Sequence, residues 1–180
     1  MKTDILISGF GGQGLMSLGK IIARAALSEG KEVSWFPSYG AEMRGGTAHC
    51  FVKICDKPIA SPLIDYPDVA IILNKPSFEK FKNSIKKDCL LIINSDLADS
   101  VSLDKNIRSI RCHFNKVALE CGNPRVANSV VLGLLIANKN NFLKKESVVN
   151  ILKAMFKDKK QVLDANLKGF LKGQELLKKI

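Results

Sequence analysis

Four glycines stand near the start of the chain, between an apolar run and a helical pattern. Residues 5–7 are typical of a strand, and Gly9, Gly11, Gly12 and Gly14 follow directly. Glycines let the backbone approach an anion closely, and the free N–H groups and dipole of a helix start favour negative charge. A strand, a glycine turn and a helix start in this order hold a phosphate in nucleotide-binding folds. We therefore predict a phosphate-bearing ligand at this turn.

The same spacing, Gly9-x-Gly11-x-x-Gly14, also matches the dinucleotide fingerprint. That fingerprint includes an acidic residue at the end of the next strand, which binds a ribose hydroxyl. The next expected strand covers residues 32–36, and no carboxylate follows it before Glu42, inside a loop. A stand-alone NAD(P)-binding Rossmann-like protein is therefore the alternative function. A turn that only packs a helix against a sheet is a further alternative, although it needs fewer glycines.

A second polar, glycine-rich stretch follows the second expected strand, at residues 37–47. It combines the hydroxyls of Ser38 and Tyr39 with the cation of Arg44. Open α/β sheets bind ligands at the carboxyl ends of their strands. If the first two strands are neighbours, this loop lies beside the glycine turn, and Arg44 supplies a bidentate contact to the same phosphate. The alternative is a surface loop whose arginine docks onto another chain.

Hydrophobic periodicity and breaker residues divide the rest of the chain into alternating strands and helices. A short return strand at 58–61 is expected to close a local hairpin, and 96–105 is expected to be a connection. This alternation predicts a three-layer α/β/α fold with a mostly parallel sheet and a Rossmann-like start, in one domain over residues 1–180. Strands are expected at 3–8, 32–36, 47–54, 68–73, 90–94 and 107–112, and helices at 13–28, 75–84, 115–120, 124–138, 145–156 and 163–179.

Composition narrows the classes of function. The chain has 180 residues, of which 46% are hydrophobic, enough for one buried core. The formal net charge of +11 favours anionic partners or a lysine-rich solvated surface, and no reader motif for nucleic acid accompanies it. The longest apolar stretch, residues 126–137, is interrupted by polar residues and predicts a buried helix rather than a membrane span. No signal peptide is recognised, so a cytoplasmic location is expected.

Five cysteines, at positions 50, 55, 89, 112 and 121, are scattered singly. Isolated cysteines behave as small hydrophobic residues, so we predict buried free thiols and no metal or iron–sulfur site in this chain. His49 lies within an expected strand and is predicted to be a packed side chain. Trp35 is predicted to lie in the core or an interface. No catalytic residue is assigned.

Three motifs together resemble the gamma subunit of 2-oxoacid:ferredoxin oxidoreductases. They are Gly-Phe-Gly-Gly-Gln-Gly at 9–14, Pro-Ser-Tyr-Gly-Ala-Glu-Met-Arg-Gly-Gly at 37–46, and Gly-Asn-Pro at 122–124 ahead of a helix with Asn128 and Gly133. The match covers nearly the whole chain and extends to residues 166–173. The second motif is the distinctive one, and it is most similar to 2-oxoglutarate-type members.

The resemblance implies a subunit of a multi-chain enzyme that converts a 2-oxoacid and coenzyme A to acyl-CoA, carbon dioxide and reduced ferredoxin. In that family, thiamine diphosphate, magnesium and the iron–sulfur clusters belong to the partner subunits, alpha, beta and delta. The resemblance also implies that ferredoxin binds to the complex as a whole, and that neither nucleic acid nor a membrane is a partner of this chain. The gamma part is associated with coenzyme A binding and with contacts to alpha.

A site hypothesis follows from the resemblance and the residue types together. Coenzyme A carries a diphosphate and a 3′-phosphate, which glycine-turn amides and a cation suit. In this hypothesis the turn cradles a phosphate and the second loop completes the rim, while Glu42 orients Arg44 or meets another subunit. The residues of the hypothesis are Gly11, Gly12, Gln13, Gly14, Ser38, Tyr39 and Arg44.

Overall fold

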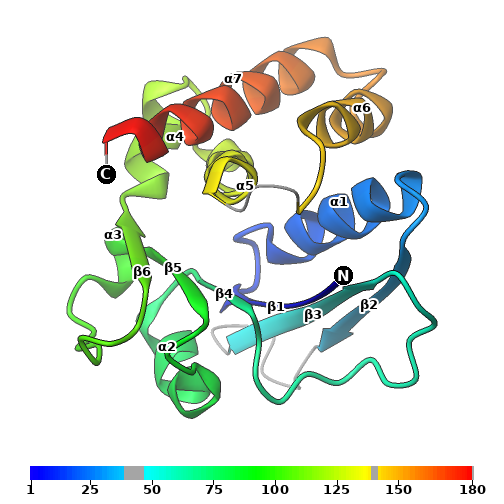
Figure 1. Cartoon of the computed structure of the whole chain (residues 1–180). Helices are drawn as coiled ribbons and strands as arrows, with labels where there is room; N and C mark the ends of the chain where they lie inside the picture. Colours follow the sequence, from blue (N-terminus) through cyan, green and yellow to red (C-terminus); the bar gives the residue numbers. More distant parts are fainter. Residues whose placement is uncertain (39–46, 139–141, 180) are drawn as a thin grey trace.

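The structure is a computed structural model that describes residues 1–38, 47–138 and 142–179. Its strands and helices alternate along the chain, as the sequence predicts (Figure 1). The strands are β1 (Lys2–Phe10), β2 (Glu32–Ser38), β3 (Thr47–Cys55), β4 (Val69–Ile72), β5 (Leu90–Asn94) and β6 (Ser109–Cys112). The helices are α1 (Leu15–Ser28), α2 (Lys75–Phe81), α3 (Ser95–Ala98), α4 (Phe114–Glu120), α5 (Ala127–Asn138), α6 (Lys145–Met155) and α7 (Lys160–Leu176), with 3₁₀ turns η1 (Lys82–Ser84), η2 (Pro124–Val126) and η3 (Leu177–Lys179).

One six-stranded sheet has the order β2-β3-β1-β4-β5-β6. The strands β1, β4, β5 and β6 run parallel to one another, whereas β3 pairs antiparallel with both β1 and β2. Because β3 reverses direction twice, β2 runs the same way as β1. The carboxyl ends of every strand except β3 therefore meet at one edge of the sheet. Open α/β sheets place ligands at this edge.

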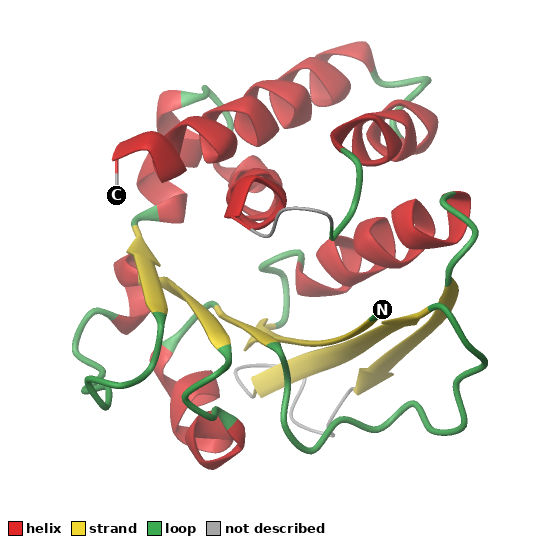
Figure 2. Ribbon diagram, in the orientation of Figure 1, coloured by secondary structure: helices red, strands yellow, loops and turns green. Residues whose placement is uncertain are grey.

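Helices cover both faces of the sheet, and the three-layer α/β/α prediction is confirmed (Figure 2). The first face is covered by α1 and α5, with α6 and α7 packed outside them, and forms the larger core, which contains Ile5, Ile7 and Phe170 (Figure 1). The second face packs against α2 and α3 around Leu6 and Ile72. The chain crosses from the first face to the second between β1 and β4, and the glycine turn lies at this switch point.

The burial pattern of each strand explains its place in the sheet. β4 and β5 are buried at every residue, as strands covered on both faces must be. β3 instead alternates, with Cys50, Val52 and Ile54 buried toward α1 and the residues between them partly exposed. The apolar stretch that the sequence placed in a buried helix is α5, which lies between the sheet and α7. Within the described residues, no helix is both long and apolar enough to cross a membrane.

The structure differs from the sequence-based expectations at several points. Residues 58–61 form no strand, because β3 already pairs along its whole length with β1 on one side and β2 on the other. For the same reason the first two expected strands are not neighbours, since β3 lies between them. In addition, the expected connection at 96–105 begins with the short helix α3, and α1 begins at Leu15 rather than at Gln13.

Candidate functional site

A cavity of about 720 Å³ opens at the carboxyl edge of the sheet, on the face covered by α1 and α5. Gly12, Gln13 and Gly14 form one wall, and Leu73 and Asn94 at the ends of β4 and β5 form the floor. The opposite wall comes from α4 and from the start of η2 and α5. Apolar side chains of α1, α5 and α7 complete the lining. The sequence prediction of a site at this edge therefore coincides with a cavity of ligand size.

The glycine turn has the backbone that the sequence predicts. Gly12 and Gly14 have positive φ angles of 92° and 76°, a region that residues with a Cβ rarely adopt. Gly14 is the N-cap of α1, and no side chain of the described chain caps this helix start. The N–H groups of the first turn are consequently free for an anion.

Gln13 has a structural role that the sequence did not reveal. Its Oε1 accepts hydrogen bonds from the backbone N–H of Phe10 at 2.6 Å and from Asn74 Nδ2 at 3.1 Å. Its Nε2 donates to the carbonyl oxygen of Leu73 at 3.4 Å. These bonds tie the glycine turn to the ends of β1 and β4. Although Gln13 lines the cavity, its side chain holds the turn in place.

A second helix start faces the same cavity. Asn123 caps the η2 turn by accepting a hydrogen bond from Arg125 N at 3.0 Å, and Pro124 occupies the first position. The two helix starts approach each other closely, because a Cβ on Gly14 would lie 3.0 Å from Asn128 Nδ2. Neither helix carries an acidic residue in its first turn. Both helix dipoles therefore present their positive ends to one cavity.

The charges that line the cavity point to an anionic ligand. Arg125 is the one ionisable side chain among the described lining residues, and none of them is a carboxylate. The Arg125 side chain is exposed, and within the described chain it forms no hydrogen bond or ion pair. A free guanidinium beside two helix starts suits a phosphate, which it can bind bidentately.

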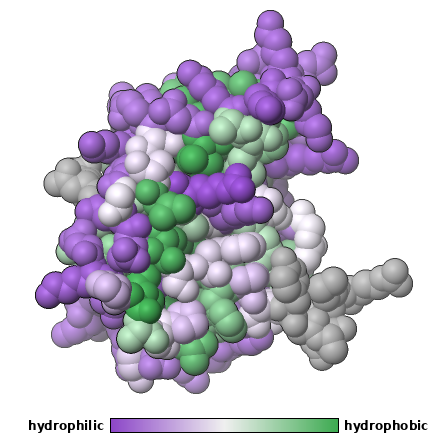
Figure 3. All heavy atoms as spheres, turned by 90° about the vertical axis from the view of Figure 1, so that its right-hand side faces the viewer, coloured by the Kyte–Doolittle hydropathy of each residue, from purple (hydrophilic) through white to green (hydrophobic). Residues whose placement is uncertain are grey.

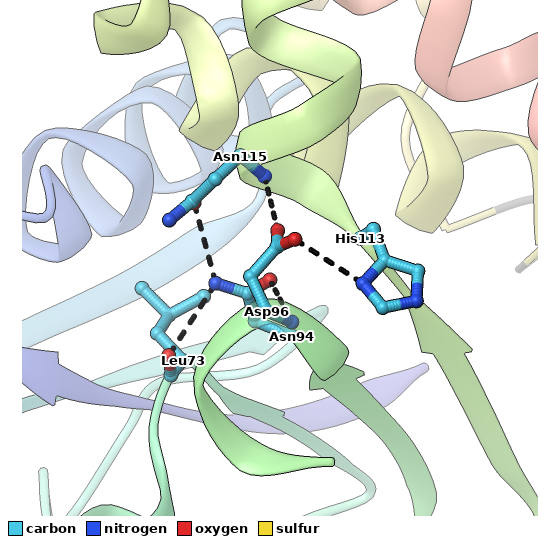
Figure 4. A network of polar contacts seen from close by, with 5 residues as sticks. All are labelled: Leu73, Asn94, Asp96, His113 and Asn115. Carbon is cyan, nitrogen blue, oxygen red and sulfur yellow. Dashed lines mark hydrogen bonds and ion pairs between the residues drawn. The ribbon is translucent and has the colours of Figure 1, made fainter.

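An asparagine network shapes the floor of the cavity (Figure 4). Asn94 Nδ2 donates to the carbonyl oxygen of Leu73 at 3.5 Å and to Asn115 Oδ1 at 3.3 Å. Asp96 accepts from the backbone N–H of Asn115 at 2.7 Å and lies 3.2 Å from His113 Nδ1. The carboxylate of Asp96 is thereby directed toward α4 and His113. The floor thus presents amides rather than charges to the cavity.

Only some of the predicted site residues line the cavity. Gly12, Gln13 and Gly14 line the cavity, whereas Gly11 lies exposed in the same turn without lining it. Ser38 ends β2 opposite His49, on the second face of the sheet, so it is not brought to the cavity. Tyr39, Glu42 and Arg44 lie outside the described residues.

Sequence reasoning missed Arg125 and the asparagines as part of a site. A signal was present, because Asn followed by Pro is a typical N-cap and first helical position. What the sequence could not show is that this helix start meets the glycine turn, since more than a hundred residues separate them. Only the packing of α5 beside α1 brings Arg125 to the cavity.

The thiols are structural. Cys50, Cys89, Cys112 and Cys121 are buried, as predicted, whereas Cys55 is partly exposed, and none of the five forms a disulfide. Burial raises the pKa of Cys50 to about 12 and that of Cys112 to about 11, so neither is a thiolate at neutral pH. Within the described residues, no three His, Cys, Asp or Glu side chains are grouped as metal ligands.

A mixed sheet with a glycine turn at its switch point, beside a cavity lined by two helix starts and an arginine, is the arrangement of a nucleotide-binding type of α/β fold. Residues 4–176 match the model of the pyruvate ferredoxin/flavodoxin oxidoreductase family, and the chain belongs to that family. The resemblance to gamma subunits of 2-oxoacid:ferredoxin oxidoreductases is thereby confirmed.

Three known proteins illustrate this relationship. The ketoisovalerate oxidoreductase subunit VorA of Methanothermobacter marburgensis is 37% identical over 99% of this chain, which spans only 37% of VorA. The gamma subunit of the keto/oxoacid ferredoxin oxidoreductase from Geobacter sulfurreducens has a TM-score of 0.85 and 28% identity, with 99% of both chains covered. The 2-oxoglutarate:ferredoxin oxidoreductase from Magnetococcus marinus, solved with 2-oxoglutarate, coenzyme A and succinyl-CoA, has a TM-score of 0.90 and 27% identity, with 99% of this chain and 31% of that chain covered.

Proposed function

We propose that this chain is the gamma subunit of a 2-oxoacid:ferredoxin oxidoreductase, and that its cavity binds a phosphate of coenzyme A. The complete enzyme would oxidatively decarboxylate a 2-oxoacid, transfer the acyl group to the thiol of coenzyme A and pass the electrons to ferredoxin. Thiamine diphosphate, magnesium and the iron–sulfur clusters would belong to alpha, beta and delta partner subunits. The buried thiols of this chain do not suit a cluster, which needs several thiolates close together.

One observation carries the ligand assignment. Two helix starts without acidic residues and the free guanidinium of Arg125 converge on one cavity whose described lining holds no carboxylate. Such a site stabilises a dianionic phosphate and disfavours a neutral ligand. The Magnetococcus enzyme was solved with coenzyme A bound, which supports this choice of phosphate ligand.

The chain's own contribution would be to bind and orient rather than to react. Amides at Gly12 and Gly14 and the guanidinium of Arg125 would hold the phosphate end of coenzyme A. The apolar part of the lining, which includes Phe156 and Val131, would take an uncharged part of the molecule. Fixing the ligand at one end lowers the entropic cost of presenting its thiol to a partner subunit. In this proposal Tyr39 and Arg44 belong to the rim, as the resemblance implies, whereas Ser38 does not, because its side chain lies on the opposite face of the sheet.

The acid is proposed to be 2-oxoglutarate. This choice rests on the motif at residues 37–46, and the structural likeness to the Magnetococcus enzyme supports it. The VorA relative is named for ketoisovalerate, so a branched-chain 2-oxoacid is the competing substrate. A panel of 2-oxoacids offered to the purified complex would decide between them by kcat/KM.

The test of the ligand site is kinetic. In the purified complex, Arg125→Ala should raise the KM for coenzyme A about tenfold, because a charge-assisted hydrogen bond contributes roughly 1.5–3 kcal/mol. The KM for the 2-oxoacid should not change. Arg24→Ala is the matched control, since Arg24 is an exposed arginine of α1 that does not line the cavity. An equal rise in both KM values would refute the assignment, and tight binding of NAD(P) without coenzyme A would favour a stand-alone nucleotide-binding protein.

A further inference from the structure

Three asparagines line the cavity at the starts of α4, η2 and α5, and the chain itself engages the side-chain oxygen of each. Asn123 Oδ1 accepts a hydrogen bond from the backbone N–H of Arg125 at 3.0 Å, and Asn128 Oδ1 accepts one from that of Ser129 at 2.9 Å. A backbone N–H can only donate, so the atom that faces it must be the amide oxygen. The NH₂ groups of these two asparagines therefore remain for other partners.

The orientation of the third asparagine, Asn115, is fixed through its neighbour Asn94 (Figure 4). Asn94 Oδ1 accepts from the backbone N–H of Asp96 at 3.3 Å, and Asn94 Nδ2 donates to the carbonyl oxygen of Leu73 at 3.5 Å. Because a carbonyl oxygen can only accept, the two ends of the Asn94 amide cannot be exchanged. Asn94 Nδ2 also lies 3.3 Å from Asn115 Oδ1. Asn115 thus presents its oxygen to Asn94 and keeps its own NH₂ group unpaired.

The three NH₂ groups are available to a ligand. Within the described part of the chain, the Nδ2 atoms of Asn115, Asn123 and Asn128 have no hydrogen-bond partner, and none of them is closed off from solvent. All three residues are half-buried in the cavity lining. Asn128 Nδ2 is directed toward the glycine turn, since a Cβ on Gly14 would lie 3.0 Å from it. The free NH₂ groups therefore line the same cavity as the two helix starts.

The remaining polar groups of the lining offer few acceptors. Gln13 Oε1 and the carbonyl oxygen of Leu73 each accept two hydrogen bonds from the chain, which uses both of their lone pairs. Asn166 Oδ1 accepts from Ser129 Oγ at 2.6 Å. Ser17 carries the one hydroxyl among the lining residues that the structure describes, and a hydroxyl can donate as well as accept. The side chains of the cavity therefore present mainly hydrogen-bond donors.

A cavity of donors selects among ligand groups. Phosphate oxygens only accept, and each can take hydrogen bonds from several N–H groups. A hydroxyl must also place its own proton, and a buried proton without an acceptor is costly. In dinucleotide-binding folds a carboxylate accepts from a free ribose hydroxyl, whereas an arginine accommodates a ribose phosphate. This cavity has Arg125 and no described carboxylate, which suits the phosphorylated ribose.

We propose that the cavity selects a nucleotide whose ribose carries a phosphate, and that Asn115, Asn123 and Asn128 are its specificity-determining residues. This inference rests on the proposed function for its first probe, because coenzyme A carries a 3′-phosphate on its ribose. In 3′-dephospho-coenzyme A a hydroxyl takes the place of that phosphate. The two molecules therefore differ only in the group that the asparagines are proposed to recognise.

A binding measurement tests the selectivity. The protein is purified from its native cells with whatever chains accompany it, and the two ligands are titrated into it by isothermal calorimetry. Coenzyme A should bind at least about tenfold more tightly than its dephospho form, because charge-assisted hydrogen bonds to the ribose phosphate are lost. Equal dissociation constants for the two ligands would overturn the inference and leave the proposed function standing.

Exchange of asparagine for aspartate tests the residues. It keeps the oxygen that the chain engages and replaces the NH₂ group by a second oxygen, which can only accept. Asn115→Asp and Asn128→Asp should each weaken coenzyme A binding by about tenfold to a hundredfold and dephospho-coenzyme A binding by less. Asn128→Ala removes the NH₂ group without adding charge and should also narrow the preference. An unchanged preference in all three variants would overturn the assignment.

Asn150→Asp is the matched control. Asn150 is exposed on α6 and does not line the cavity. Figure 3 looks at the side of the molecule to which α6 belongs, and the upper part of this view is mostly hydrophilic. The control therefore adds the same charge to a surface that is already polar, and both dissociation constants should stay the same. A loss equal to that of Asn128→Asp would reduce the effect to net charge and overturn the proposal. Melting temperatures show that each variant is folded.

Nicotinamide dinucleotides separate this inference from the proposed function. If neither form of coenzyme A binds, the proposed function fails, and NADP and NAD become the probes, since only NADP carries a ribose phosphate. An NADP preference of about tenfold that Asn128→Asp narrows would then uphold the inference alone. Equal binding of NADP and NAD, or no binding of any of the four ligands, would overturn it as well.

Discussion

Asn74 Nδ2 donates to Gln13 Oε1 at 3.1 Å and joins the glycine turn to the end of β4. The same Gln13 oxygen accepts from the Phe10 backbone N–H, so it closes the turn against two strands. A Cβ on Gly9 would lie 2.5 Å from this oxygen, which explains why glycine precedes Phe10. The turn is thus held in one shape by the chain itself, and under the proposed function such preorganisation would increase the affinity for the phosphate.

Gln13→Ala should loosen the turn. The substitution leaves the part-buried Phe10 N–H without its partner, at a cost of about 1–3 kcal/mol in the free energy of unfolding. We expect a lower melting temperature and a higher KM for coenzyme A, both measured on the purified complex. The control is Asn106→Ala, which removes only an exposed side-chain hydrogen bond to Asp104. If Gln13→Ala changed the KM without any loss of stability, Gln13 would be a ligand contact and not a brace.

Two glycines with the same strained backbone allow binding to be separated from stability. Gly12 and Gly30 have φ angles of 92° and 75°, and a Cβ at either position would meet no atom within 4 Å. Alanine at either position would have to adopt the left-handed conformation. Each substitution should therefore lower the free energy of unfolding by about 1–2 kcal/mol. Gly12 lines the cavity, whereas Gly30 follows the end of α1.

Gly12→Ala should consequently weaken coenzyme A binding, and Gly30→Ala should not. The comparison measures both melting temperature and the KM for coenzyme A in the complex. Similar stability losses with a selective rise in the KM for Gly12→Ala would support the cavity as the site. Equal KM values in the two variants would place the ligand elsewhere.

Close packing of α5 on α7 gives a stability prediction. A Cβ on Gly133 would overlap the carbonyl oxygen of Phe170, and one on Gly173 would overlap that of Val130. Backbone atoms cannot move aside as a side chain can, so Gly133→Ala should cost about 3 kcal/mol or more of unfolding free energy. Lys168→Ala, at an exposed position of α7, is the control. A melting temperature unchanged in Gly133→Ala would show that the two helices separate easily.

Much of this fold could be predicted from the sequence because its signals are local. The apolar runs of β4 and β5, the glycine turn at β1 and the breaks that end α1 all lie within a few residues of what they determine. The order of the sheet could not be predicted, because the position of β3 between β1 and β2 depends on pairing between distant residues. An isolated alternating strand such as β3 fits a local hairpin and a central position equally well.

In the candidate site, too, the features set by local sequence could be predicted and those set by distant contacts could not. Gly12 and Gly14 were predictable, because a positive φ angle before a helix demands glycine. Ser38 was predicted from its place after a strand, but the insertion of β3 puts its side chain on the opposite face of the sheet from the cavity. Arg125 reaches the cavity only through the packing of α5, a long-range contact that no local pattern encodes.

His49 gives the chain a pH-dependent stability. Burial against Phe51 and Phe81, together with the nearby positive charge of Lys80, lowers the pKa of His49 below its ordinary value of 6.5. The folded state therefore binds this proton more weakly than the unfolded state does. The contribution of His49 is fully present above the unfolded pKa, and it is lost as the pH falls through 6.5 toward the folded pKa.

His49→Gln should consequently reduce the fall in melting temperature between about pH 7.5 and about pH 5. Lys80→Ala should reduce it partly, because it removes the repulsion but leaves the burial. Both variants and the unmodified chain are compared by thermal unfolding across this range. If the pH dependence of His49→Gln equalled that of the unmodified chain, protonation of His49 would not be coupled to folding, and its packing against Phe51 and Phe81 would have to be looser than the ring contacts indicate.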